Sequence, residues 1–255
     1  MNRISTLTDM KPGFQYIDRE EIHVQGISRL LLIGDAGCSG FYEDSRKIFG
    51  QLLGNRTDLI FFLGDLTFTG AEEEYQEIID FCNSRVQTPV FSLCGNHDLL
   101  NYDTFLGLAS YALVLDTFVC LFLSSPTGHF SERNLEFLAA SLKKHSGKHF
   151  IILMHIPPPT DIHRNHMPQS EWEKLRTVLD PHRHQITRIF CGHLHGFHEY
   201  QIDGYEVTIT AGGGAAMIYD LKMPGQKIHH AIAIDLQSNG SINTELLIAE
   251  RIDSK

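Results

Sequence analysis

The sequence is short of basic residues and of long apolar runs. It has 21 Lys and Arg against 31 Asp and Glu, a formal net charge of −10. That balance disfavours binding to a polyanionic duplex or an anionic membrane through a general basic surface. The segment 1–26 has no apolar stretch long enough for a signal peptide or a membrane span. We therefore expect a cytoplasmic protein without a membrane contact or a general nucleic-acid-binding surface, and the oligomeric state stays open.

Cysteines are few, and their spacing is irregular. There are five, an odd number, and four of them lie in apolar runs, which favours buried free thiols over disulfides. Low-complexity tracts and internal repeats are lacking as well. Hydrophobic residues make up 42% and charged residues 20% of the chain, close to the averages of globular proteins. A single domain over residues 1–255 is the expectation.

Short apolar runs alternate with helical patterns in the first part of the chain. Strands are predicted over 29–33, 59–63 and 90–94, and helices over 41–53 and 71–85 lie between them. This alternation indicates a largely parallel sheet flanked by helices.

The rest of the chain contains more strands than helices. A helical or irregular segment covers 99–108, and a helix from Ser131, a suitable N-cap, extends to about 145. Single strands are predicted over 150–154 and 189–191. Three hairpins are predicted as well, with the strand pairs 111–115 and 118–123, 197–202 and 205–210, and 231–236 and 242–248. Two sheets packed face to face with outer helices would satisfy this order.

Five short polar segments each follow a strand-like run directly. Residues just past the carboxyl ends of parallel strands line a common crevice, and the glycines in the segments allow a backbone to approach a ligand closely. The segments offer carboxylates, an amide and imidazoles on loops, which suits a two-metal hydrolytic site. They are Gly34-Asp35-Ala36-Gly37, Gly64-Asp65-Leu66-Thr67, Gly95-Asn96-His97-Asp98, Met154-His155-Ile156-Pro157 and Gly192-His193-Leu194-His195.

In this order the segments resemble the calcineurin-like metallophosphoesterase superfamily, and the resemblance covers roughly residues 29–210. The pattern of that family is Asp-x-His or Asp-x-Gly, then Gly-Asp, then Gly-Asn-His-Asp or Glu, then a His after a strand, then Gly-His-x-His. The resemblance implies an α/β fold, a four-layer αββα sandwich with two mixed β-sheets, whose β-rich part 197–250 completes the second sheet. It also implies a metal-dependent phosphoric ester hydrolase.

The resemblance further implies two divalent metal ions. Oxygen donors and neutral imidazoles suit Mn, Fe or Zn, and two such ions would generate a bridging hydroxide that attacks phosphorus in line. The implied ligands are Asp65 as the bridge, Asn96, His155 and His193 for the second ion, and Asp35 and His195 for the first.

Two further sets of residues are predicted to act on the substrate. In similar families the equivalent of His97 faces the substrate and assists the leaving oxygen, while the equivalent of Asp98 orients it; a solvated turn histidine is the alternative. The Pro-rich segment 157–168 is either a surface loop or a flap that faces the substrate. Candidate substrate-binding residues are Asn96, His163 and Arg164.

The sequence departs from the family at the first metal. Position 37 is Gly, so the His of the Asp-x-His pattern is missing, and the subgroup similar to purple acid phosphatases has Tyr where this chain has Phe68. Either the first site is weak or the following loop replaces the ligand, with candidates Cys38, Tyr42, Glu43 and Asp44. We expect that loop to be a solvated helix start, and hence a first site that is short of one ligand.

Several functions are compatible with these residues. The first is a metal-dependent phosphoesterase acting on small phosphate mono- or diesters. A phosphodiesterase for nucleotides or cyclic nucleotides is an alternative, and so is a weakened member of the fold that serves as a scaffold for a protein partner. A thiol hydrolase using Cys38 lacks a supporting local signature.

Overall fold

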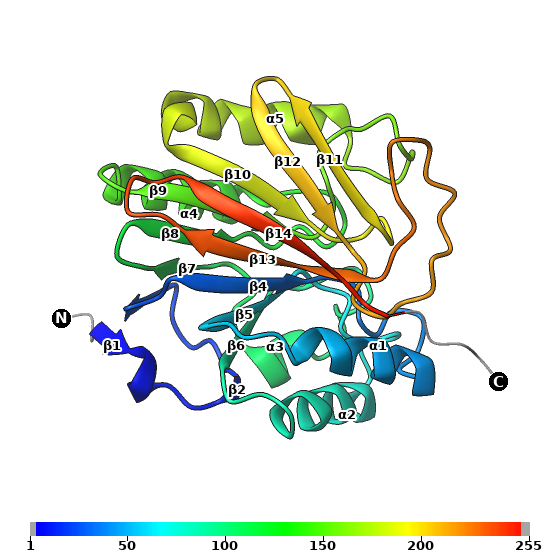
Figure 1. Ribbon diagram of the computed structural model, residues 1–255. Helices are drawn as coiled ribbons and strands as arrows, with labels where there is room; N and C mark the ends of the chain where they lie inside the picture. Colours follow the sequence, from blue (N-terminus) through cyan, green and yellow to red (C-terminus); the bar gives the residue numbers. More distant parts are fainter. Residues whose placement is uncertain (1–3, 251–255) are drawn as a thin grey trace.

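Two mixed β-sheets form the centre of the computed structural model, which describes residues 4–250 (Figure 1). The strands are β1 (Ile4–Thr6), β2 (Gly13–Phe14), β3 (Glu21–Gln25), β4 (Arg29–Ile33), β5 (Leu59–Phe62), β6 (Pro89–Ser92), β7 (Tyr111–Val114), β8 (Phe118–Phe122), β9 (His149–Met154), β10 (Ile186–Cys191), β11 (Phe197–Ile202), β12 (Tyr205–Thr210), β13 (His230–Leu236) and β14 (Ile242–Ile248). One sheet has the order β1-β3-β7-β8-β9-β10-β12-β11, and the other has the order β14-β13-β4-β5-β6-β2.

Helices cover the outer face of each sheet. They are α1 (Glu43–Leu53), α2 (Glu72–Asn83), α3 (Tyr102–Leu106), α4 (Glu132–Lys144) and α5 (Gln169–Leu179), with short 3-10 helices over Leu7–Asp9 and Asp180–Gln185. The first three pack on the six-stranded sheet, and the last two pack on the eight-stranded sheet (Figure 1). This arrangement confirms the four-layer αββα sandwich with two mixed β-sheets.

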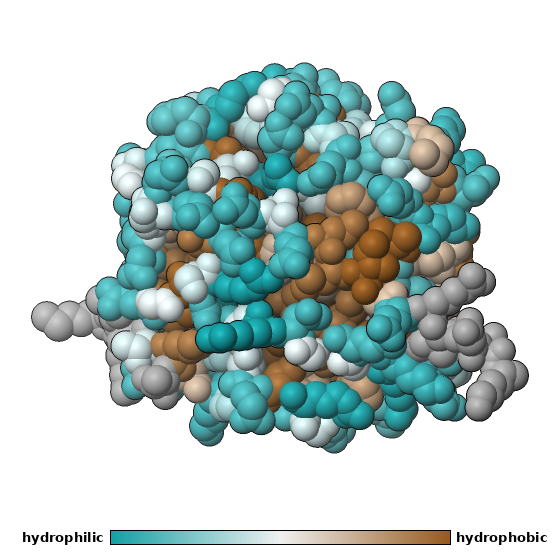
Figure 2. All heavy atoms as spheres, viewed as in Figure 1, coloured by the Kyte–Doolittle hydropathy of each residue, from teal (hydrophilic) through white to brown (hydrophobic). Residues whose placement is uncertain are grey.

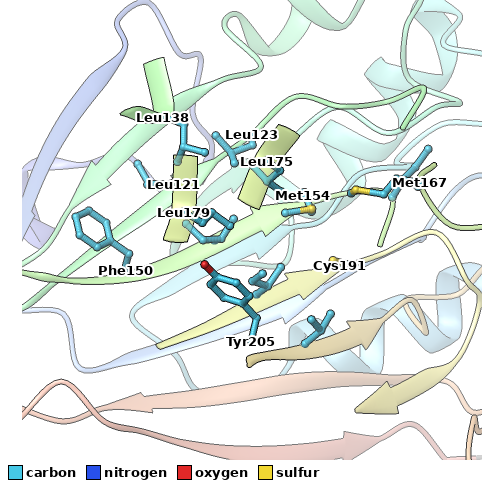
Figure 3. Close-up of a cluster of buried hydrophobic side chains, with 14 of the residues drawn as sticks. Leu121, Leu123, Leu138, Phe150, Met154, Met167, Leu175, Leu179, Cys191 and Tyr205 are labelled. Carbon is cyan, nitrogen blue, oxygen red and sulfur yellow. The ribbon is translucent and has the colours of Figure 1, made fainter. Parts of the chain in front are cut away.

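Side chains along β8 alternate between the two hydrophobic cores on either face of the sheet. Phe118, Cys120 and Phe122 point into the core between the two sheets, whereas Val119 and Leu121 belong to the core under the helices. Successive side chains of a strand point to opposite faces, so an entirely apolar strand is buried on both sides. Figure 3 shows the outer core, where labelled leucines of α4 and α5 lie over side chains of β9 and β12.

The C-terminal hairpins are divided between the sheets, so the prediction that 197–250 completes the second sheet is wrong in part. Strands β11 and β12 extend the eight-stranded sheet through the parallel pair β10–β12. Strand β13 instead pairs antiparallel with β4 in the six-stranded sheet. The long connection 211–229 carries the chain from one sheet to the other. Residues 1–3 and 251–255 of the predicted single domain lie outside the described residues.

Three strands and one helix were not predicted. Strand β3 alternates polar and apolar residues and is half-buried, and β1 and β2 are only two or three residues long. Helix α5 buries Trp172, Leu175 and Leu179, a helical spacing that the sequence does contain. None of the described helices combines the length and the apolar character that crossing a bilayer requires.

The outer surface on one side of the molecule is mainly hydrophilic. Figure 2 shows this side, with a hydrophobic area near its centre among hydrophilic residues. All five cysteines are buried and free, which confirms the prediction for the four that lie in apolar runs. The polar segments singled out in the sequence follow the parallel strands β4, β5 and β6 in one sheet and β9 and β10 in the other. The carboxyl ends of these strands meet at one edge of the sandwich.

Candidate metal centre

Three of the predicted ligands lie on turns with left-handed backbone. The φ angles are 59° at Asp35, 55° at Asp65 and 73° at His193. Among the other non-glycine residues in the described part of the chain, only Asn101 and Asp203 have positive φ. Such conformations cost about 1–3 kcal/mol each and cluster at functional sites, where the surrounding structure enforces them. The turns therefore point three donor side chains toward one place.

Glycines next to these turns allow the carboxylates to approach the backbone. A Cβ on Gly95 would lie 2.2 Å from Asp65 Oδ1, and one on Gly192 would lie 2.7 Å from Asp35 Oδ2. Heavy atoms cannot approach so closely, hence both positions exclude a side chain. The prediction that these glycines serve the geometry of the site is confirmed.

The residues predicted for the second metal lie together. Donor atoms of Asp65, His155 and His193 all lie within 4.8 Å of one another, and Asn96 Oδ1 lies 3.0 Å from His155 Nε2. The other ring nitrogen of His155, Nδ1, donates to the carbonyl of Leu63 at 2.7 Å. Metal-binding histidines usually donate their second ring nitrogen in this way, which fixes the ring.

The contacts of His155 Nε2 are unfavourable unless a cation lies between the atoms. Nε2 faces Asn96 Oδ1 at 3.0 Å and Asp65 Oδ1 at 3.3 Å, and all three atoms are acceptors when the imidazole is neutral. Burial would lower the pKa of His155, but the charge of Asp65 and its hydrogen bond raise it to about 10. Either a proton or a metal ion must therefore lie among these atoms.

A second group of donors adjoins the first and shares Asp65 with it. Donor atoms of Asp35, Cys38, Asp65 and His195 also lie within 4.8 Å of one another, and all four residues are buried. His195 Nε2 lies 3.2 Å from Cys38 Sγ and 3.6 Å from Asp35 Oδ1. Its Nδ1 donates to the carbonyl of Ala216 at 2.5 Å, so Nε2 presents its lone pair to the group.

The electrostatics of the two groups fit bound cations. Burial raises the pKa of Asp35 well above its usual range, and the nearby charge of Asp65 adds to this effect. Burial lowers the pKa of His193 to about 3, so its ring is neutral, and its Nδ1 is buried without a hydrogen-bond partner. Paired carboxylates, neutral imidazoles and an orphaned ring nitrogen form a donor set that suits Mn, Fe or Zn.

His97 lies at the edge of this centre, but a different group orients it than predicted. Its backbone N–H donates to Asp65 Oδ1 at 3.0 Å, and its Nδ1 donates to the carbonyl of Phe68 at 2.7 Å. Asp98 is fully buried and accepts from the backbone N–H groups of Thr67 and Gly95, both at 3.0 Å. The prediction that Asp98 orients the His97 ring is therefore wrong, because its oxygens bind the two loops together.

Phe68 supplies an aromatic ring where the similar subgroup has a tyrosine. The side chain is 50% exposed, and its ring is stacked on that of His97 at a centroid distance of 6.0 Å. It has no ligand atom, as the sequence indicated. Its backbone carbonyl rather than its side chain contributes to the site.

The Pro-rich segment 157–168 has no regular structure, as predicted, but it is anchored. Ile162 and Met167 are buried in the outer core, and the N–H of Met167 donates to the carbonyl of Pro157 at 2.9 Å. Arg164 is exposed. The role of His163 and Arg164 in substrate binding stays a prediction.

Tyr219 is the residue of this region that sequence reasoning missed. Its ring centroid lies 5.0 Å from that of His195, 6.1 Å from that of His193 and 4.9 Å from that of His163. It belongs to the connection 211–229, which has no motif that would have marked it. Tyr219 thus links the loop of His163 to the two histidines of the last segment.

A family comparison agrees with this geometry. The sequence model described as calcineurin-like phosphoesterase matches residues 28–197. The chain belongs to the calcineurin-like phosphoesterase family. That match includes every residue predicted as a metal ligand. The assignment of single residues to individual ions remains a prediction.

Individual members of the family show how far the likeness extends. A relative from Arcobacter nitrofigilis, named as a probable glycerophosphodiester phosphodiesterase, is 28% identical over 159 residues, which cover 55% of this chain and 57% of the relative. The chain therefore matches little more than half the length of that relative.

Two solved structures share the fold. A purple acid phosphatase from yellow lupin has a TM-score of 0.67 and 14% identity over 87% of this chain and 51% of its own. A dimetal phosphatase from Danio rerio has a TM-score of 0.63 and 13% identity, over 88% of this chain and 99% of its own. At such low sequence identity these structural similarities show a shared fold and nothing more.

Proposed function

We propose that this protein is a metal-dependent phosphoesterase that hydrolyses small phosphodiesters. The observation that carries the proposal is the pair of adjoining donor groups that share Asp65. Metal ions held there would supply the Lewis acidity that activates water and neutralises phosphoryl oxygens. A preference for diesters is supported by the relative named as a phosphodiesterase. The buried free thiols fit a reducing compartment, such as the cytoplasm.

Different residues of the chain would bind the metal ions and donate the proton. Asp65, with Asn96 and the histidines, would hold two divalent ions next to each other at the strand ends. The Phe68 carbonyl fixes the His97 ring through Nδ1, which leaves Nε2 to give a proton to the leaving oxygen. A general acid in such a position accelerates a reaction by about 10²–10⁴-fold. The acidic balance of the chain argues for a small substrate rather than a nucleic acid.

The test compares two substrates on the same metal-loaded protein. The protein is purified without chelators and loaded with Mn, Fe or Zn, and hydrolysis of a bis-nitrophenyl phosphate is compared with that of nitrophenyl phosphate. We expect metal-dependent hydrolysis with the higher kcat/KM for the diester. A higher kcat/KM for the monoester would overturn the diester preference. A protein that binds two ions and hydrolyses neither ester would overturn the proposal as a whole.

A further inference from the structure

Position 37 cannot supply a ligand to the first metal in this fold. A Cβ on Gly37 would lie 1.8 Å from the carbonyl oxygen of Leu66, and the N–H of Gly37 donates to the carbonyl of Asp65 at 3.0 Å. The turns that carry Asp35 and Asp65 are therefore in direct backbone contact at this point. No side chain fits between them, so the missing family ligand cannot be restored without moving the turns apart.

The next residue along the chain brings a thiol to the place where that ligand is missing. Cys38 is 4% exposed, and its Sγ lies 3.2 Å from His195 Nε2. Because His195 donates its Nδ1 proton to the carbonyl of Ala216, Nε2 is an acceptor within hydrogen-bond distance of the thiol. Sγ also lies within 4.8 Å of donor oxygens of Asp35 and Asp65.

The other candidates in this loop do not reach the site. Tyr42 is 72% exposed. Glu43 and Asp44 lie in the first turn of α1, and the carboxylate of Glu43 is paired with Lys47 at 2.7 Å on the surface. The prediction of a solvated helix start holds for these three residues and fails for Cys38, which turns inward instead.

We propose that the thiolate of Cys38 is a ligand of the first metal ion, together with Asp35, Asp65 and His195. This inference rests on the proposed function, because it assumes that the centre binds metal. On binding, the ion takes the place of the thiol proton, which leaves to solvent, and a bond from sulfur to the metal forms. A thiolate is a soft ligand, so the first site favours Zn or Fe over Mn, while the second keeps only oxygen and nitrogen donors.

Cobalt(II) makes the proposed bond visible without measuring catalysis. The wild type loaded with Co(II) should show a thiolate-to-cobalt charge-transfer band in the near ultraviolet, and Cys38→Ser should lose it. Cys82→Ala is the matched control, because Cys82 lies on the buried face of α2 and is fully buried in its core, and it should keep the band. An unchanged band in Cys38→Ser, or no band in a wild type that binds two cobalt ions, overturns the inference and leaves the proposed function intact.

X-ray absorption spectroscopy of the zinc-loaded wild type tests for the bond between sulfur and metal without a variant. With two zinc ions bound, we expect on average half a sulfur neighbour per zinc at about 2.3 Å. A shell of only oxygen and nitrogen would contradict the ligand role of Cys38. A wild type that takes up no zinc and no cobalt would overturn the proposed function, and the inference with it.

Discussion

The Nε2 atom of His155 lies 3.0 Å from the Oδ1 atom of Asn96, and the fold fixes both partners. The ring of His155 is anchored to the Leu63 carbonyl in the neighbouring sheet, while Asn96 follows β6. Each atom is an acceptor in the neutral state, so the contact repels unless a cation lies nearby. The edge where the two sheets meet therefore requires a proton or a metal ion between these acceptor atoms.

Removing the His155 imidazole should empty one of the two metal sites. His155→Ala leaves the second site with fewer donors, and we expect about one bound ion per chain instead of two, with a large loss of kcat. His198→Ala is the control, because His198 is also buried but stacks on Tyr200 in β11. Elemental analysis of both dialysed variants checks this. Two ions retained in His155→Ala would contradict the assignment.

A methyl group at Gly95 should disrupt the centre through sterics alone. The added Cβ would lie 2.2 Å from Asp65 Oδ1 and 2.3 Å from Asp65 N, so Gly95→Ala must displace the shared carboxylate. We expect weaker metal binding and a lower melting temperature. Gly147→Ala is matched, because a Cβ there would meet nothing within 4 Å. Calorimetry with and without metal measures both effects, and equal behaviour of the two variants would disprove the packing argument.

His97→Ala should slow turnover without releasing metal. The lost general acid predicts a fall in kcat of about 10²–10⁴-fold, while the ligand set of the ions stays complete. His184→Ala, at an exposed histidine outside the site, should behave as the wild type. Steady-state kinetics on the nitrophenyl diester together with metal content tests this. If His97→Ala kept full kcat, the acid role would be wrong.

Acid should weaken the fold at a cluster away from the metal centre. Burial would raise the pKa of Glu21, but hydrogen bonds from Lys144, His145 and His23 outweigh it and lower the pKa to about 2, against 4.5 for a free side chain. The unfolded chain therefore binds a proton that the folded chain refuses between these values. Glu21 contributes fully to stability above about pH 5, and its contribution is lost as the pH falls toward 2.

The Glu21→Gln variant isolates this contribution. Because Glu21 is partly exposed, we expect the unfolding free energies of wild type and variant to differ by about 1–2 kcal/mol more at pH 6 than at pH 3. Urea unfolding at several pH values measures the difference. A gap between the two proteins that does not change with pH would contradict the prediction.

The sequence predicted the parts of the site that depend on local chemistry. Each ligand lies on the loop that follows a strand, and for every loop except that of His155 the sequence shows a strand end, a Gly and a polar residue, a pattern that can be recognised without the fold. The direction of Cys38 could not be recognised in this way. It depends on Gly37 packing against the Leu66 carbonyl, a contact between two separate strand ends.

The other features that the sequence did not predict also depend on contacts between distant segments. The group that orients the His97 ring is the backbone carbonyl of residue 68. Every residue type has this carbonyl, so the sequence cannot indicate the contact. Tyr219 reaches the histidines from a long connection without regular structure. The antiparallel pairing of β13 with β4, which sets Ile232 opposite Leu32 and Ile234 opposite Leu30, likewise joins two segments far apart in the chain, and the prediction of one sheet for 197–250 missed it.

The count of metal ions in wild type and Asp65→Ala tests the central claim most directly. Asp65 is the one residue common to both donor groups, so its loss should weaken both sites together. We predict two ions per chain for the wild type at saturating metal and fewer than one for Asp65→Ala after the same dialysis. A wild type that binds fewer than one ion, or an Asp65→Ala protein that keeps two, would contradict a shared two-metal centre.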